Sequence, residues 1–560
     1  MKRRFRTIKL IAAMLIFHVA HGSAQNNAVD VLKKSADREQ LFMEYEKQPE
    51  ARRAPADAAW NFASTITKEE LKEHLLILAS DEYEGRETGK RGQKKAAEYI
   101  ADYYKQLGIE PCNSGSYFQQ YPLKITKSST SSMDVNGIEF KFVDDFYFWG
   151  GFDANDVDVK NCVFAGYGIE SPAYNDYANM DVRGKVVLII QGEPKKDGKS
   201  LVTGTTEPSE WADDFELKNL LAKEKGATAL LVIDDEYANY VSRIRYWLES
   251  PSMRLDLPNE KGGDLIPYAI VSPKLGNAIL KAGKKKVFEK YTLKISKKGM
   301  PVSFPFTGNS VFHVKREHTL ISAENVLGFI EGSDPKLKDE VVVISAHYDH
   351  IGITKGEINN GADDDGSGTV ASLEIAEAFM EAKRNGQGPR RSILILNVSG
   401  EEKGLLGSEW YSEYPVFPLE KTVCDLNIDM IGRNDSMHTT DKYVYLIGSD
   451  KLSTDLHRIS EECNSRYTKL AIDYTYNDPE DPNRFYYRSD HYNFAKHNVP
   501  VIFYFSGVHE DYHKPGDDEH KILYDKMVTI AQLVFVTAWE VANRDEKLKV
   551  DVVNEFENRD

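Results

Sequence analysis

Histidine and acidic residues follow short apolar runs in the second half of the chain. They are His347 and Asp349 after residues 340–346, Glu401 and Glu402 after 391–398, Asp429 within 422–430, and Tyr512 and His513 after 500–505. Mixed imidazole and carboxylate ligands suit Zn²⁺. Two imidazoles and at least three acids match two metal ions about 3.5–4 Å apart that share a carboxylate. We therefore predict a dinuclear metal site.

The stretch "NNGADDDGSGT" (359–369) places Asp363, Asp364 and Asp365 side by side among glycines. Carboxylates at short range raise one another's pKa unless a cation compensates them, which favours a metal loop. Taken alone, the aspartates also fit the cap of a helix that begins near Gly368. A calcium loop of the EF-hand type is excluded, because its frame requires acids where Gly361 and Ser372 stand.

Other chemistries lack their motifs. The chain contains no HExxH helix, no phosphate-binding loop and no complete GxSxG elbow. With 560 residues, 41% hydrophobic and 28% charged, the chain is typical of a globular protein of three or four domains, or of one large domain with insertions. Its net charge of −17 argues against nucleic acid as a partner.

The apolar runs are the elements that must position these residues. Residues 340–346, 391–398, 422–430 and 500–505 are almost continuously apolar, as strands buried on both faces are. A helical pattern lies between the first two, at 368–383. This alternation predicts an α/β fold with a mostly parallel twisted sheet flanked by helices. Ligands of such sheets bind beyond the carboxyl ends of the strands, where the candidate residues stand.

The first half of the chain predicts different elements. Residues 67–110 carry two amphipathic helical patterns, and Thr67 with Glu70 forms a capping box. Residues 156–315 predict a compact, β-rich module from four short β-rich runs and one helical stretch near "LKNLLAKEKGA".

The N-terminus has the pattern of a signal peptide. Residues 1–24 combine a basic start, an apolar run and small residues before the expected cleavage point. The run from Leu10 to Ala20 is shorter than the ~20 residues of a spanning helix. We expect an exported protein, periplasmic or extracellular, with no stable membrane insertion and a mature charge of −22, because five cations and no acids are removed. The four cysteines form no CxxC pair, and Cys424, in an apolar run, predicts a buried free thiol.

The site motifs closely resemble those of the M28 family of dinuclear zinc peptidases. The matching blocks are "AHYDHIG", "GADDDGSGT", "SGEEKGLLGS", "NIDMIGR" and "YHKPGD". The resemblance implies a phosphorylase/hydrolase-like zinc exopeptidase fold from about residue 67 to 545. The stretch "FAGYGIESPAYNDYANMDVRGKVVLIIQGEP" is similar to a protease-associated (PA) domain inserted in that fold.

Carried over by position, the resemblance implies a role for each candidate. His347 and Asp429 would bind one zinc, Glu402 and His513 the other, and Asp364 would bridge the two. Glu401 corresponds to the general base, and Asp349 to the acid that orients the imidazole of His347. Tyr512 stands where some relatives carry a tyrosine that hydrogen-bonds the reacting carbonyl. Asp490 and His491, in "RSDHYNF", receive no role, and a helix cap is their plain interpretation.

These assignments predict a zinc-dependent aminopeptidase that acts on peptides. The expected parts are a signal peptide (1–24), an N-terminal helical segment with the first part of the peptidase (25–155), a PA domain (156–315), the catalytic domain (316–545) and a tail (546–560). A glutamate-type carboxypeptidase remains open, although the sequence has no distinctive arginine cluster near the site motifs. A glutaminyl cyclase and a non-catalytic binding ectodomain are less favoured. Sequence does not determine the oligomeric state.

Overall fold

The computed structural model describes residues 56–127, 129–148, 156–257 and 265–554. The predicted signal peptide lies outside these residues. The chain forms two compact units, one containing 56–123 and 321–554 and the other containing 124–320. The chain passes between them within β1 (Phe118–Thr126) and β15 (His318–Ile330). None of the helices in the described ranges combines the length and apolar composition needed to cross a membrane.

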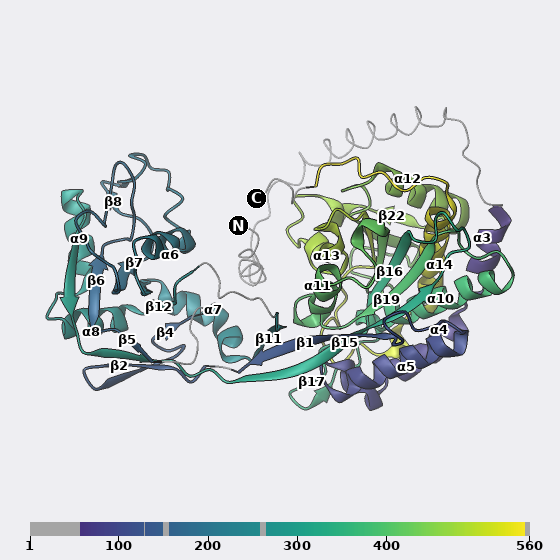
Figure 1. Cartoon of the computed structure of the whole chain (residues 1–560), viewed down its shortest axis with the longest axis horizontal. Coiled ribbons are helices and arrows are strands. Elements are labelled where there is room, and N and C mark those ends of the chain that lie inside the picture. The colour runs from purple at the N-terminus through teal and green to yellow at the C-terminus, as the bar shows by residue number, and fades with distance from the viewer. Residues whose placement is uncertain (1–55, 128, 149–155, 258–264, 555–560) are drawn as a thin grey trace. The chain divides into compact units, whose positions relative to one another are not determined.

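The larger unit is built on a mixed, mostly parallel sheet (Figure 1). Its strands run in the order β1-β15-β19-β16-β20-β23-β21-β22. Those not yet defined are β16 (Val341–His347), β19 (Ser392–Val398), β20 (Thr422–Ile428), β21 (Tyr443–Ile447), β22 (Ala471–Asp473) and β23 (Val501–Phe505). The four runs predicted as buried strands are neighbours in this sheet and pair in parallel. The predicted α/β fold class is therefore confirmed.

Alternate residues of these strands face two apolar layers. On β16, Val342 and Ile344 pack into a cluster that includes residues of α10 (Gly368–Arg384) and α14 (Tyr524–Asn543). Val341 and Val343 join a second cluster with residues of α11 (Leu406–Glu413) and α13 (His491–Ala495). Burial on both faces explains why these runs are apolar at nearly every position.

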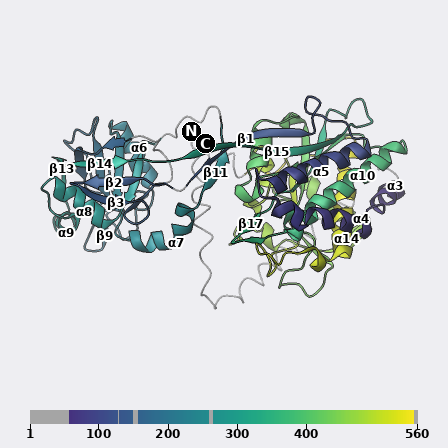
Figure 2. The ribbon, with the colours of Figure 1, turned by 90° about the horizontal axis from the view of Figure 1, so that it is seen from below.

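The N-terminal helices lie beside α10 and α14 (Figure 2). They are α3 (Ala56–Ala63), α4 (Lys68–Leu78) and α5 (Arg91–Leu107). The predicted cap is present, since Oγ1 of Thr67 accepts the backbone N–H of Glu70 at 3.3 Å. A short 3-10 turn, η2 (Asp81–Arg86), connects α4 and α5, and α12 (Thr454–Cys463) packs against α14.

The smaller unit contains two main sheets. One has the order β13-β6-β7-β10-β12-β4 and the other the order β3-β2-β14-β5. The strands of these sheets are β2 (Ser132–Val135), β3 (Ile138–Lys141), β4 (Phe146–Tyr147), β5 (Asp156–Asp158), β6 (Asn161–Ala165), β7 (Val186–Ile190), β10 (Ala229–Ile233), β12 (Tyr268–Val271), β13 (Ser303–Thr307) and β14 (Ser310–His313). A further strand, β11 (Ser252–Leu255), belongs to neither sheet. Short hairpins are β8 (Lys195–Lys196) with β9 (Lys199–Ser200), and, in the larger unit, β17 (Ile353–Thr354) with β18 (Glu357–Ile358).

The four β-rich runs predicted within residues 156–315 correspond to β6, β7, β10 and β12, which are parallel neighbours. The predicted helical stretch is α6 (Phe215–Glu224). The unit also contains α7 (Tyr237–Glu249), α8 (Pro273–Ala282) and α9 (Phe288–Lys298), for which the sequence analysis made no prediction. That this unit is a PA domain stays a prediction.

Candidate active site

The carboxyl ends of four parallel strands bring the predicted site residues together. His347 is the last residue of β16, and Asp429 directly follows β20. Glu401 and Glu402 form a short 3-10 turn after β19, and His513 lies in the loop that follows β23. Because β19, β16, β20 and β23 are adjacent and parallel, these side chains share one edge of the sheet.

Asp364 stands between two groups of these residues. Its Oδ1 lies 3.4 Å from Nε2 of His347, and its Oδ2 lies 3.1 Å from Nε2 of His513. The two oxygens of one carboxylate thus face two different imidazoles. This is the arrangement that a carboxylate bridging two cations requires.

Each group contains further acidic residues. In the first, Nε2 of His347 lies 3.5 Å from Oδ1 of Asp429 and 3.9 Å from Oε2 of Glu401. In the second, Oε2 of Glu402 lies 3.1 Å from Nε2 of His513. Both groups offer closely spaced nitrogen and oxygen atoms of the types that bind zinc.

The polar atoms at the centre of the site support a fit to metal ions. Five of them are buried, and no hydrogen bond reaches them from the described residues. These atoms are Nε2 of His347, Oδ2 of Asp364, Oε1 of Glu402, Oδ1 of Asp429 and Nδ1 of His350. Buried polar atoms are normally satisfied, and two dications would satisfy these at once. The residues therefore fit the expected metal pair.

Mutual electrostatics shift the pKa values of these groups. Burial opposes protonation of His347, but the carboxylates of Asp429 and Glu401 raise its pKa well above the ordinary value. Burial and Asp364 work against ionisation of Glu402, yet His513 and His350 hold the pKa of Glu402 at about 2. For Glu401, burial dominates and raises the pKa well above its usual range. A cation bound in the site would change the electrostatic environment of each of these groups and therefore its pKa.

The two neighbours of Asp364 have other partners. Oδ1 of Asp365 accepts the N–H groups of Gly368, at 2.7 Å, and of Met430, at 3.2 Å. Oδ1 of Asp363 accepts the N–H of Gly432 at 2.6 Å. The helix-cap interpretation of the three aspartates therefore holds for Asp365. Both flanking aspartates tie the loop to the segment that follows β20.

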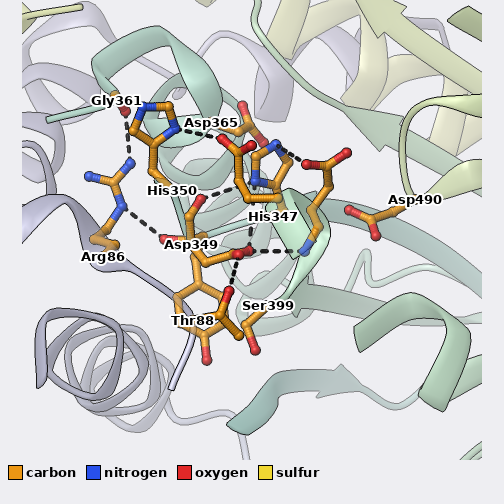
Figure 3. A network of polar contacts seen from close by, with 12 residues as sticks. Arg86, Thr88, His347, Asp349, His350, Gly361, Asp365, Ser399 and Asp490 are labelled. Atoms are coloured by element: carbon orange, nitrogen blue, oxygen red, sulfur yellow. Dashed lines mark hydrogen bonds and ion pairs between the residues drawn. The ribbon is translucent and has the colours of Figure 1, made fainter. Parts of the chain in front are cut away.

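Arg86 connects the N-terminal part of the chain to this loop (Figure 3). Its guanidinium is almost fully buried and donates to four carbonyl oxygens, those of Leu78, Tyr348, Asn360 and Gly361, at 2.7–2.8 Å. These carbonyls belong to α4, to the segment after β16 and to the start of the aspartate loop. One side chain thus holds three segments together.

Asp349 supports the site through its carboxylate and its main chain (Figure 3). Its carboxylate accepts the hydroxyl of Thr88 at 2.6 Å and the N–H of Glu401 at 3.3 Å. Nδ1 of His347 lies 3.1 Å from the main-chain oxygen of Asp349 and 3.8 Å from its carboxylate. The main chain of Asp349 therefore orients the imidazole more directly than its side chain does.

Residues 489–491 support the site without a helix-cap contact. Oγ of Ser489 donates to Oδ2 of Asp429 at 2.7 Å. The carboxylate of Asp490 makes no cap hydrogen bond to α13 and instead accepts the hydroxyl of Ser408 at 2.5 Å. Asp490 therefore stands at the N-cap position of α13, as expected, but its side chain makes no cap hydrogen bond.

A pocket beside the site combines polar and aromatic walls. Asp364, Glu401 and Asp429 line its metal end, and Tyr512 and Arg488 lie with them. The apolar lining consists of Met430, Phe485, Phe503, Phe505 and Val508. The ring of Tyr512 stacks on His513, with 3.9 Å between centroids, and Nη2 of Arg488 lies 3.4 Å from its hydroxyl.

Sequence reasoning missed four of these residues. His350 and Arg488 lie within quoted motifs, His350 in "AHYDHIG" and Arg488 at the start of "RSDHYNF". A polar residue so close to a predicted ligand was the available signal. Arg86 and Thr88 lie about 260 residues before their partners, and no local pattern points to those contacts.

The sequence profile of Peptidase family M28 matches residues 325–538, which contain all eight predicted site residues. This segment, somewhat more than a third of the chain, is similar to the peptidases of that family. A probable leucine aminopeptidase of Arthroderma benhamiae is 29% identical over 216 residues, 37% of this chain and 56% of the relative. A probable glutamate carboxypeptidase of Arabidopsis thaliana is 33% identical over 125 residues, 22% of this chain but only 17% of the relative.

Among solved structures, the aminopeptidase from Aneurinibacillus sp. strain AM-1 is 17% identical, with a TM-score of 0.49, covering 88% of this chain and 98% of that one. A zinc aminopeptidase from Bacillus subtilis is 16% identical, with a TM-score of 0.43, covering 88% and 99%.

Proposed function

We propose that the chain is a zinc-dependent exopeptidase, and specifically an aminopeptidase that removes N-terminal residues from peptides. One observation carries the proposal: the two oxygens of Asp364 face the imidazoles of His347 and His513 separately. The match of residues 325–538 to the profile of Peptidase family M28 supports it.

In this proposal each metal ion has its own ligands and shares one. His347 and Asp429 would hold the first zinc, Glu402 and His513 would hold the second, and Asp364 would contribute to both. When bound, the zinc ions supply Lewis-acid polarisation of the scissile carbonyl and lower the pKa of water in the site. Ser489 keeps the carboxylate of Asp429 in place by donating to its Oδ2.

Glu401 is the proposed general base. Its carboxylate faces the pocket beside Asp364 and Asp429, and its backbone N–H is held by Asp349. Glu401 takes a proton from the attacking water and then delivers it to the leaving amine. The hydroxyl of Tyr512 lines the same pocket and is proposed to donate to the carbonyl oxygen as negative charge develops there.

The charges of the pocket favour an aminopeptidase. Three carboxylates, those of Asp364, Glu401 and Asp429, stand at its metal end. Asp364 and Asp429 are proposed zinc ligands, so Glu401 is the carboxylate at this end that stays available to attract a protonated α-amino group. The aromatic wall of Phe485, Phe503 and Phe505 suits an apolar side chain at the substrate's N-terminus.

Arg488 favours the second candidate, a glutamate-type carboxypeptidase. Its guanidinium lies over the ring of Phe485, 4.7 Å from the centroid, at the same pocket. No ion pair joins it to a carboxylate among the described residues. A cation available in a substrate pocket can bind a substrate carboxylate.

Peptides blocked at one end separate the two candidates. The zinc-loaded protein is assayed on matched peptides carrying an acetylated N-terminus or an amidated C-terminus, with zinc counted per chain. The aminopeptidase proposal predicts that acetylation abolishes hydrolysis and that amidation leaves it intact. The reverse pattern establishes a carboxypeptidase, and Arg488→Leu should then raise the KM. Purified protein that binds no zinc contradicts both and favours a non-catalytic protein.

A further inference from the structure

His350 is a buried histidine to which the proposed mechanism assigns no role. Its side chain has no exposed surface, and it lies beside the second group of site residues (Figure 3). Nδ1 lies 2.8 Å from Oε1 of Glu402 and 3.7 Å from Oδ2 of Asp364. Both of these residues are proposed ligands of the second zinc.

Nδ1 of His350 and Oε1 of Glu402 are in close contact, 2.8 Å apart. Nδ1 of His350 and Oε1 of Glu402 are both buried, and neither takes part in a hydrogen bond with any described residue. Two buried polar atoms this close together can serve as neighbouring ligands of one shared cation. Neighbouring ligands of a tetrahedral zinc ion with bonds near 2.0–2.1 Å lie about 3.3 Å apart.

We propose that His350 is a fourth protein ligand of the second metal ion, through Nδ1, together with Asp364, Glu402 and His513. Oδ2 of Asp364 lies 3.1 Å from His513 and 3.7 Å from His350, so it has an imidazole nitrogen on each of two sides. His350, Asp364 and Glu402 each offer a ligand atom within 4.8 Å of the other two. The inference rests on the proposed metal centre.

Packing against Gly361 fixes the orientation of the His350 ring. A Cβ on Gly361 would lie 2.5 Å from both Cγ and Cδ2 of His350, so only glycine leaves room for the imidazole there. The φ angle of Gly361 is +57°, in the left-handed region that glycine adopts without strain. With this edge of the ring against the backbone, the Nδ1 edge is directed to Glu402.

Direct metal titration tests the proposal without an activity assay. Protein stripped with a chelator is titrated with zinc by calorimetry in competition with a chelator of known affinity, for the wild type, His350→Ala and His350→Asn. Asparagine retains an N–H donor near the position of Nδ1 but is a poor zinc ligand. If His350 binds metal, both variants should bind one of the two zinc equivalents about 100-fold more weakly, or weaker still. Mutation of residues that only support the ligands already lowers metal affinity by about 10–100-fold, and loss of a ligand should cost at least as much.

Cobalt substitution supplies a second readout. Because the visible absorption of bound Co²⁺ depends on its coordination number and ligands, loss of an imidazole ligand should change the spectrum of one of two equivalents in both variants. His74→Ala is the matched control, because His74 is also buried against a buried glutamate, Glu374, with Nε2 3.1 Å from its Oε1. This control should keep the wild-type titration and spectrum.

Each remaining outcome overturns the assignment. Wild-type zinc affinity in His350→Ala removes any role of His350 in metal binding. If zinc affinity falls in His350→Ala but returns to the wild-type value in His350→Asn, His350 acts by donating a hydrogen bond to Glu402 and is not a metal ligand. If the wild type itself binds fewer than two equivalents, the proposed dinuclear centre fails, and with it the premise of the inference.

Discussion

Oδ1 of Asp365 accepts the backbone N–H of Gly368 at 2.7 Å, at the first residue of α10. The adjacent residue, Asp364, directs its carboxylate to the two histidines instead. Neighbouring aspartates of the same loop therefore differ in function: one caps a helix, and the other is the proposed bridge between two metal ions.

We therefore expect substitutions of Asp364 and Asp365 to have different effects on the protein. Asp364→Asn should lower both the zinc content and the activity, because the amide supplies one neutral oxygen where two ionised oxygens face two ligand groups. Asp365→Asn should keep both zinc equivalents and lower the free energy of unfolding by about 1 kcal/mol through the weaker cap. Zinc counted per chain and denaturant unfolding measure the two effects. A larger loss of zinc in Asp365→Asn than in Asp364→Asn would assign the bridging role to Asp365 instead.

Replacing Glu401 with glutamine should separate metal binding from catalysis. The change preserves the size of the side chain and removes the proton acceptor, so kcat should fall by about 10²–10⁴-fold. Glu401 is not a proposed ligand, and zinc content should therefore match the wild type. Substantial remaining turnover in a fully zinc-loaded variant would exclude Glu401 as the base.

Removing Arg86 should destabilise the larger unit. Arg86→Ala leaves four carbonyl oxygens without their donor, and each buried unsatisfied acceptor costs about 1–3 kcal/mol. We expect a loss of more than about 3 kcal/mol in the free energy of unfolding, measured by denaturant titration of metal-free protein. Arg86→Lys should recover only part of it, because an ammonium has three donors. The control is Arg384→Ala, whose half-exposed side chain pairs with Glu381 on α10; an equal loss in both would contradict the prediction.

The buried ring of His491 should make stability depend on pH. Burial against Phe503, 4.8 Å between ring centroids, lowers the pKa of His491 to about 3, from 6.5 for an exposed histidine. Between these values the unfolded chain takes up a proton that the folded chain does not, so stability falls as pH falls from about 6.5 towards 3. From pH 7 to pH 5 this component amounts to about 2 kcal/mol.

The check compares metal-free wild type with His491→Phe, which does not titrate. The wild type should lose about 2 kcal/mol more than the variant when denaturant unfolding is repeated at pH 5 instead of pH 7. Identical pH dependence of the two proteins would show that the folded state takes up the same proton at His491, so that its pKa is not lowered by burial.

Much of the fold follows from local patterns. The runs at 340–346, 391–398, 422–430 and 500–505 are apolar at nearly every position because helices cover both faces of the sheet, and that pattern is visible without a structure. The predicted helix at 368–383 agrees with α10 to within one residue. The α7–α9 helices of the smaller unit were not predicted, although α8 and α9 are amphipathic and α8 begins with a serine cap followed by proline.

Sequence by itself determined which residue types stand at the ends of the buried strands, because strand periodicity and the motifs around His347, Glu401 and Asp429 are local properties. Only the tertiary structure decided that β19, β16, β20 and β23 are neighbours, that Asp364 faces both histidines, and that Arg86, Thr88 and His350 belong to the same site. Those relations join segments as much as 275 residues apart. They arise from chain packing and side-chain direction, which composition and spacing do not encode.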